Sequence, residues 1–223
     1  MNETIKFMNM NEVEAPAENT PRKGEFYILI PDVRGGGPGH GITLENKLSI
    51  PLPKHISQDA SAAGLKDIKE TPRLRQGSAV SMPNDLDSSF RGYWLVSEPL
   101  KKIFESIDPK AFDFAKCDFI LHDGSQAPPH YLCEVVREID AIDEQSSQVK
   151  VLTEGYPKGK FYSLTGGAKL AFRKELVGSS HIFRTPYTAD SFCDRAFRDA
   201  LIDNGFGEPR NSRGVWLIDA ADY

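Results

Sequence analysis

The stretch from Gly92 to Asp143 decides the fold: it begins with GYWLVSEP (92–99) and ends with CEVVREIDAID (133–143). Its opening residues, Tyr93–Val96, form a short run that is mainly aromatic and apolar. This composition favours a strand. A second run, from His130 to Asp140, alternates in side-chain direction and is rich in the same residue types, which predicts another strand. A helix is predicted between them, and the other elements are expected to pack around this unit.

An amphipathic helix is predicted over residues 97–108. Four apolar residues fall at i, i+3, i+4 and i+7, on one helical face: Leu100, Ile103, Phe104 and Ile107. The hydroxyl of Ser97 can cap the first turn, where Pro99 is tolerated because a first-turn N–H has no helical partner. The helix is expected to end at Asp108, because the residue before a proline is disfavoured in the α region.

A second amphipathic helix is predicted over residues 189–204. Its apolar stripe consists of Phe192, Cys193, Ala196, Phe197, Ala200 and Leu201. Thr188 or Asp190 can cap its start, and Gly205 supplies the left-handed residue that commonly follows a helix. Together with the strands, these two main helices predict the α+β class with a mixed or antiparallel sheet.

Further strands are expected on both sides of the two helices. Glu25–Ile30 is a continuous apolar run, which suits a central strand buried on both faces. A hairpin is expected from residues 161–164 and 169–172 around Gly166 and Gly167. A short helix is expected at 57–65, and the other predicted strands are 46–52, 79–82, 117–121, 149–152, 181–184 and 214–218.

The length of 223 residues suits one domain better than two. Residues 25–223 are expected to form a single α+β domain, and the polar residues 1–24, with Pro16 and Pro21, are expected to form a flexible arm. The first residues lack the apolar core of a signal peptide, and no window approaches the ~20 apolar residues of a membrane span. We therefore expect a cytoplasmic protein without a membrane partner.

The charge balance is mildly acidic, with 27 basic and 32 acidic residues and a formal net charge of −5. Nucleic acid is therefore not an expected partner. A partner with a basic face fits better, although so small a charge is also ordinary for solubility. Cys117, Cys133 and Cys193 lie in apolar contexts, which predicts buried reduced thiols and leaves a disulfide open. Cys133 is a nucleophile in principle, but a thiol inside an apolar strand is more often inert.

No catalytic, cofactor or metal motif stands in the sequence. The run from Gly35 to Gly41 lacks a following Gly-Lys-Ser/Thr, and Pro38 removes a backbone donor, so a flexible loop is favoured over a phosphate cradle. The five histidines lack the spacing of zinc ligands. His122, Asp123 and His130 could meet in space, which leaves a small hydrolase or transferase as the alternative function.

Several of these elements resemble a known family. The similarity is carried by Tyr93–Ser97, Ile107–Pro109, Tyr131–Asp143, 181–184, the helix through Leu201, and 216–218. On these residues the chain is similar, over 25–218, to the immunity protein family numbered eleven of bacterial polymorphic toxin systems, formerly a domain of unknown function. The resemblance implies an α+β protein that is made beside a toxin, binds it and blocks it in the producing cell. It implies no catalytic residue, and the glycine-rich insert at 35–41 departs from the expected pattern.

An acidic surface is the expected docking site for such a toxin. It is assigned to Asp140, Asp143, Glu144, Asp219 and Asp222. Its charge would steer the protein to a basic target, and affinity would rest on a few buried anchors. Arginine or lysine at positions 140 and 143 should then slow association. A solvated sheet edge, or an acid pair or cation site that also uses Glu134 and Glu138, is the other interpretation, and a homodimer is compatible with the sequence.

Overall fold

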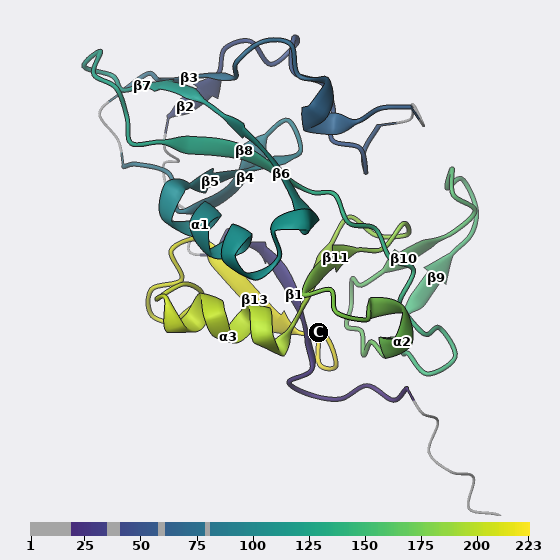
Figure 1. Ribbon diagram of the computed structural model, residues 1–223. Coiled ribbons are helices and arrows are strands. Elements are labelled where there is room, and N and C mark those ends of the chain that lie inside the picture. Colours follow the sequence, from purple (N-terminus) through teal and green to yellow (C-terminus); the bar gives the residue numbers. More distant parts are fainter. Residues whose placement is uncertain (1–18, 35–40, 58–60, 79–80) are drawn as a thin grey trace, which may run out of the picture.

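The structure is a computed structural model that describes residues 19–34, 41–57, 61–78 and 81–223. Two four-stranded antiparallel sheets form its body (Figure 1). The first sheet contains, in spatial order, β4 (Leu86–Phe90), β5 (Tyr93–Ser97), β8 (His130–Val135) and β6 (Phe112–Lys116). The second contains β11 (Ile182–Arg184), β12 (Ser191–Asp194), β1 (Phe26–Pro31) and β13 (Val215–Asp219).

Smaller elements cover the outer faces of these sheets. One small sheet contains β2 (Ile42–Leu44), β3 (Arg73–Gln76) and β7 (Asp118–Ile120), and the pair β3–β7 is parallel. The other is the pair β9 (Lys150–Leu152) and β10 (Phe161–Ser163). The short helical turns are η1 (Gly64–Asp67), η2 (Pro109–Ala111) and α2 (Lys174–Val177). The fold is therefore α+β, as predicted, and most of its regular structure is strand.

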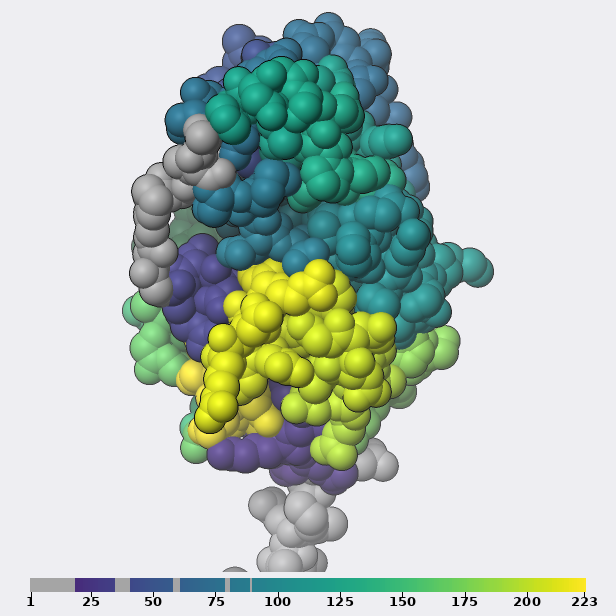
Figure 2. Space-filling view, turned by 90° about the vertical axis from the view of Figure 1, so that its left-hand side faces the viewer, coloured from purple at the N-terminus to yellow at the C-terminus, as the bar shows by residue number. Residues whose placement is uncertain are grey.

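The main core lies between the two large sheets and is shared with α1 (Glu98–Ile107) and α3 (Arg195–Asp203), which contact each other. Leu29 of β1 faces this core, whereas Ile28 faces a second core on the other side of the same sheet. The continuous apolar run thus forms a strand buried on both faces, as predicted. In the space-filling view the yellow C-terminal residues pack against purple and teal segments in one continuous body (Figure 2).

The helix predicted at 97–108 is present as α1. Ser97 is its N-cap: its Oγ accepts a hydrogen bond from the Leu100 N–H at 3.4 Å, and Pro99 lies in the first turn. Leu100 and Phe104 are fully buried in the main core. Asp108 ends the helix as predicted, so local capping residues fixed both of its ends.

The second predicted helix, 189–204, begins too early. Residues 191–194 form strand β12, and α3 covers only Arg195–Asp203. Phe192 and Cys193 face opposite sides of the sheet, which is the two-residue period of a strand. Neither Thr188 nor Asp190 is the cap: Asp194 caps α3 by accepting a hydrogen bond from the Phe197 N–H at 2.8 Å.

Several shorter predictions were also wrong. Residues 46–49 form turns after β2, and the strand expected from His130 to Asp140 ends at Val135. The expected hairpin does not form, because β10 pairs with β9, while residues 169 and 172 bridge to 148 and 142. Strands β3 and β4 lie in polar segments that carry little strand signal, and β6, with the sequence FDFAK, was also not predicted. Of the helix expected at 57–65, only Gly64 and Leu65 are helical, as the start of η1, and 58–60 lie outside the described residues.

Other predictions concern the chain ends, the loops and the thiols. Residues 1–18, 35–40 and 79–80 lie outside the described part of the chain, and Ser81 and Met82 are not in a strand. The cysteines, Cys117, Cys133 and Cys193, are buried and free. Among the residues with described positions, no helix combines the length and the apolar character that crossing a membrane requires.

Candidate functional site

Three of the five predicted acidic residues lie together. Asp140, Asp143 and Glu144 line a pocket of about 440 Å³, together with Lys160 and Arg173. The Asp140 carboxylate lies 3.4 Å from the Arg173 guanidinium, while its Oδ1 is buried without a hydrogen bond. Asp143 accepts hydrogen bonds from the backbone of its own turn, one of them from the Gln145 N–H at 3.0 Å. The pocket is therefore lined by charges of both signs.

Glu144 is the most strongly engaged carboxylate in this pocket. It pairs with Lys160 and accepts a hydrogen bond from the Tyr162 hydroxyl at 2.7 Å. These two contacts lower the pKa of Glu144. Burial lowers the pKa of Lys160, but its hydrogen bonds to Glu144 and Tyr162 outweigh burial and raise it. The ammonium also lies 4.1 Å from the centre of the Tyr187 ring, so both charges of this pair have partners inside the fold.

Asp219 and Asp222 do not line this pocket; they hold the N-terminal segment instead. Asp219 accepts a hydrogen bond from the Gly24 N–H at 2.7 Å, and Asp222 pairs with Lys23 at 2.5 Å. The same segment reaches Asp143, which accepts a hydrogen bond from the Asn19 side chain at 3.3 Å. The five predicted carboxylates therefore do not line one pocket, and three of them contact the N-terminal segment.

The alternative catalytic set is divided between an exposed turn and the core. His122 and Asp123 are exposed, and Asp123 accepts hydrogen bonds from Ser125. His130 is only 5% exposed; its ring lies edge-on to Phe119 and its Nδ1 is 2.8 Å from the Pro128 carbonyl. Burial lowers the pKa of His130. No described hydrogen bond or ion pair joins His130 to either of the other two residues.

The thiol of Cys133 has no accessible side. It is 1% exposed in the main core, and burial raises its pKa well above the ordinary value. Because the thiolate is the nucleophilic form, a thiol in this setting is inert. The structure thus supports the interpretation of Cys133 as a packing residue.

A buried group of ionisable side chains, which was not predicted, lies at the end of β8. The side chain of Glu134 is 1% exposed, and its Oε1 accepts a hydrogen bond from the Lys54 N–H at 2.6 Å and lies 3.6 Å from His55 Nδ1. Arg184, 6% exposed, donates to the Ala189 carbonyl and has its guanidinium 5.9 Å from the centre of the Trp94 ring. Glu134, His55 and Arg184 line a cavity of about 20 Å³.

The electrostatics of this buried group follow from its low exposure. Burial lowers the pKa of His55 in spite of the contact with Glu134, and burial lowers the pKa of Arg184 to about 10. Glu134 Oε2, His55 Nδ1 and Arg184 Nε have no hydrogen-bond partner among the described residues. A cavity of this size has room for about one water molecule. The group is therefore suited to a bound water and not to an organic substrate.

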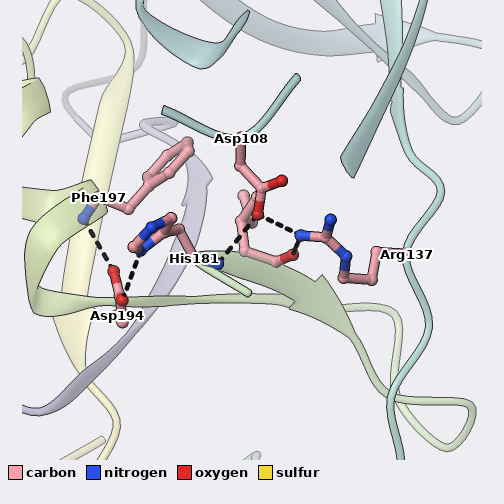
Figure 3. A network of polar contacts seen from close by, with 6 residues as sticks. Asp108, Arg137, His181, Asp194 and Phe197 are labelled. Atoms are coloured by element: carbon pink, nitrogen blue, oxygen red, sulfur yellow. Dashed lines mark hydrogen bonds and ion pairs between the residues drawn. The ribbon is translucent and has the colours of Figure 1, made fainter. Parts of the chain in front are cut away.

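A polar network joins the two large sheets (Figure 3). Asp108 at the end of α1 pairs with Arg137 and accepts a hydrogen bond from the His181 N–H at 2.9 Å. Nδ1 of His181 lies 2.8 Å from Asp194, the cap of α3. Burial raises the pKa of Asp108, but the hydrogen bonds from Arg137 and His181 outweigh burial and lower it. The network thus connects the end of one helix to the start of the other.

Among the residues that the structure describes, no group of three or more His, Cys, Asp or Glu side chains is placed to hold a metal ion. Glu134 and Glu138, considered for a cation site with Asp140 and Asp143, are engaged elsewhere. Glu134 belongs to the buried group, and Glu138 pairs with Lys158 at 3.0 Å. A charged residue between Cys133 and Val135 in an apolar strand was the one available sequence signal for the buried group.

Comparison with known proteins places these features in a family. The family described as "Immunity protein family (Imm11)" matches residues 25–222, nearly the whole chain. A search of curated proteins found no match to this chain. The match includes both large sheets, α1, α3 and the network between them. The chain therefore belongs to the Imm11 immunity protein family.

Proposed function

We propose that this protein neutralises a cognate bacterial toxin by binding to it in the cytoplasm of the producing cell, without catalysis. The observation that carries the proposal is the family match over residues 25–222. The expected mechanism is occlusion of the toxin's active site or substrate groove by the folded surface of this protein.

The hydrolase or transferase alternative has weaker support. It needs His122, Asp123 and His130 to meet at one cleft, but His130 packs edge-on against Phe119 in the core. A general base must reach its proton within hydrogen-bond distance in a plausible substrate pose. A histidine at 5% exposure, separated from the exposed turn of the other two, does not offer that geometry.

The acidic residues remain one candidate for the docking surface. Asp140, Asp143 and Glu144 share a pocket, and a basic toxin surface would be attracted to them. About two fifths of the Asp140 and Glu144 side chains is exposed, which favours this candidate. The ion pairs with Lys160 and Arg173 weaken it, because a partner would have to compete with cations that are already present.

The test is a binding and protection experiment with the toxin domain encoded beside this gene. We expect the two proteins to co-elute as a stable complex and the toxin's activity to fall to zero when the two are equimolar. A catalytic immunity protein would instead remove activity at substoichiometric amounts, increasingly with time. No complex and no protection of cells that express the toxin domain would overturn the proposal.

A further inference from the structure

A groove of about 670 Å³ lies away from the acidic pocket. One wall is the segment Leu48–Pro51, the other is residues 66–69, which include the end of η1, and Arg91 also lines it. Both walls belong to the blue segments in the upper part of Figure 1, well separated from α2 and the β9–β10 pair near the acidic pocket. The groove is open and large enough to receive side chains of another protein.

The charges in the groove are basic, in contrast to the acidic chain as a whole. Its ionisable lining residues are Lys66, Lys69, Arg91 and Asp67. Asp67 accepts a hydrogen bond from the Ala63 N–H at 2.7 Å, so part of its charge is directed into its own turn. Lys66 lies 3.6 Å from the Asp113 carboxylate, so the unpaired positive charge of the groove belongs to Lys69 and Arg91, in a chain whose formal charge is −5.

Two of these cations keep unused donor capacity. Among the described residues, no ion pair involves Lys69 or Arg91, both of which line the groove. A guanidinium matches a carboxylate geometrically and forms charge-assisted hydrogen bonds with it. Arg91 also has φ 56°, a left-handed backbone conformation that costs energy in a residue with a side chain. An acidic group entering the groove would meet positive charge that the fold has not neutralised.

Apolar side chains complete the groove. Leu48 is 84% exposed at its rim, and Pro51 and Ile68 line its walls. An exposed leucine beside unpaired cations suits a peptide segment that carries both an apolar and an acidic side chain. A phosphate backbone would use the cations but not the apolar wall. The composition of the lining therefore favours a protein partner.

The walls are held in place by buried polar contacts. The Asn46 side chain donates to the Thr71 carbonyl at 3.0 Å and accepts from the Arg73 N–H at 2.9 Å. These hydrogen bonds join the residues just before the wall at 48–51 to the residues just after the wall at 66–69. Glu134 accepts from the Lys54 N–H beyond the first wall and packs directly on Gly64 at the start of η1. A preformed groove loses less conformational freedom on binding.

We infer that this groove is a docking site for an acidic segment of the toxin that also carries an apolar anchor. The inference rests on the proposed function, because it names the surface through which the protein would bind. An acidic side chain of the toxin would contact Lys69 and Arg91, and the neighbouring apolar side chain would pack against Leu48.

The test uses the full chain, the toxin domain encoded beside its gene, and two groove variants, Lys69→Glu and Leu48→Asp. Both side chains are exposed and make no described polar contact, so neither variant is expected to alter the thermal unfolding temperature. We expect each to weaken binding about tenfold or more, as replacements at interface anchors do. Lys169→Glu makes the same charge change at an exposed lysine beside the C-terminal end, and it should bind within about twofold of wild type, as rim substitutions do.

The outcomes separate this inference from the function on which it rests. If wild type and both groove variants bind the toxin domain equally well, the groove is not the docking site, but the immunity function stands. If wild type does not bind the toxin domain, both proposals fail. If wild type binds a mixed-sequence oligonucleotide and Lys69→Glu does not, the groove belongs to a nucleic acid and the inference is overturned.

Discussion

The acidic pocket and the basic groove differ in how their charges are satisfied. In the pocket, Glu144 pairs with Lys160 and Asp140 with Arg173. In the groove, Lys66 pairs with Asp113 at 3.6 Å, but no ion pair is described for Lys69 or Arg91. The sign of a protein's net charge therefore does not reveal where a partner finds unpaired charge. The location of unpaired charge depends on which charges the fold has already neutralised. Substitutions of paired and unpaired charges test this difference.

The largest effect is expected where a paired charge is most deeply buried. Asp108→Asn keeps the shape of the side chain but removes the charge that Arg137 and the His181 N–H contact. We expect the free energy of unfolding to fall by about 3 kcal/mol, because the arginine loses its buried partner. Urea unfolding measures this loss.

Glu25→Gln is the matched control for a paired charge at the surface. Glu25 pairs with Lys174 at 2.7 Å, and about half of the lysine side chain is exposed. Its loss should cost less than about 1 kcal/mol. Equal costs for the two variants would show that the network between the sheets is no stronger than a surface pair.

A smaller loss is expected from Gly64→Ala, which tests the support of the groove. Gly64 has φ +60°, and an added Cβ would overlap Glu134 Oε2. We expect a loss of about 2 kcal/mol from backbone strain and displacement of the buried carboxylate. Gly124→Ala, with φ +84° and no atom within 4 Å of the added Cβ, carries the strain alone. A thermal unfolding temperature that falls equally in both variants would remove the contact with Glu134 from the explanation.

The buried histidines predict a pH dependence of stability. Burial lowers the pKa of His55 and of His130 below the ordinary value of 6.5. As the pH falls through about 6.5, the unfolded chain takes up protons that the folded protein does not, so stability decreases toward pH 5. We expect both histidines to contribute to this loss. His55 faces Glu134, Arg184 and Lys158, and His130 faces Asp85.

Urea unfolding at pH 7 and pH 5 measures this slope. The variants His55→Gln and His130→Gln should each flatten it. A slope that survives the removal of both buried histidines would assign the acid sensitivity to other groups.

The smallest effect is expected from charge reversal in the acidic pocket. Asp140→Lys combined with Asp143→Lys removes carboxylates that already have partners in the fold. We expect the association rate constant for the toxin domain to change by about threefold or less, as for a rim charge. Stopped-flow association kinetics measure it. A larger decrease than that caused by Lys69→Glu would make the acidic pocket the docking surface.

Features fixed by neighbouring residues could be predicted from the sequence. Helix α1 was found because Ser97 and Asp108 delimit an uninterrupted apolar period, and β1 because its residues are apolar on both faces. The start of α3 was missed because Phe192 and Cys193 fit a helical stripe, while their partners across the sheet in β1 are remote in sequence. Pairing between remote strands overrides local periodicity there.

The candidate sites divide in the same way. Asp140, Asp143 and Glu144 were grouped because they are adjacent in sequence, and they do share a pocket. Lys160 and Arg173, which pair with Glu144 and Asp140, lie in other segments of the chain, and the local sequence does not predict these ion pairs. The buried group is still more remote: His55, Glu134 and Arg184 come from three distant parts of the chain. Such groupings arise from tertiary packing alone.

The contact of Lys23 and Gly24 with Asp222 and Asp219 has a practical consequence. It brings the first described residues beside the last ones, away from the blue segments that form the groove in Figure 1. An affinity tag or a fluorescent label coupled to the exposed Lys23 or Asp222 side chain would thus lie on the side of the molecule away from the groove. Immobilising the protein through such a tag on a sensor surface would present the groove to the solution.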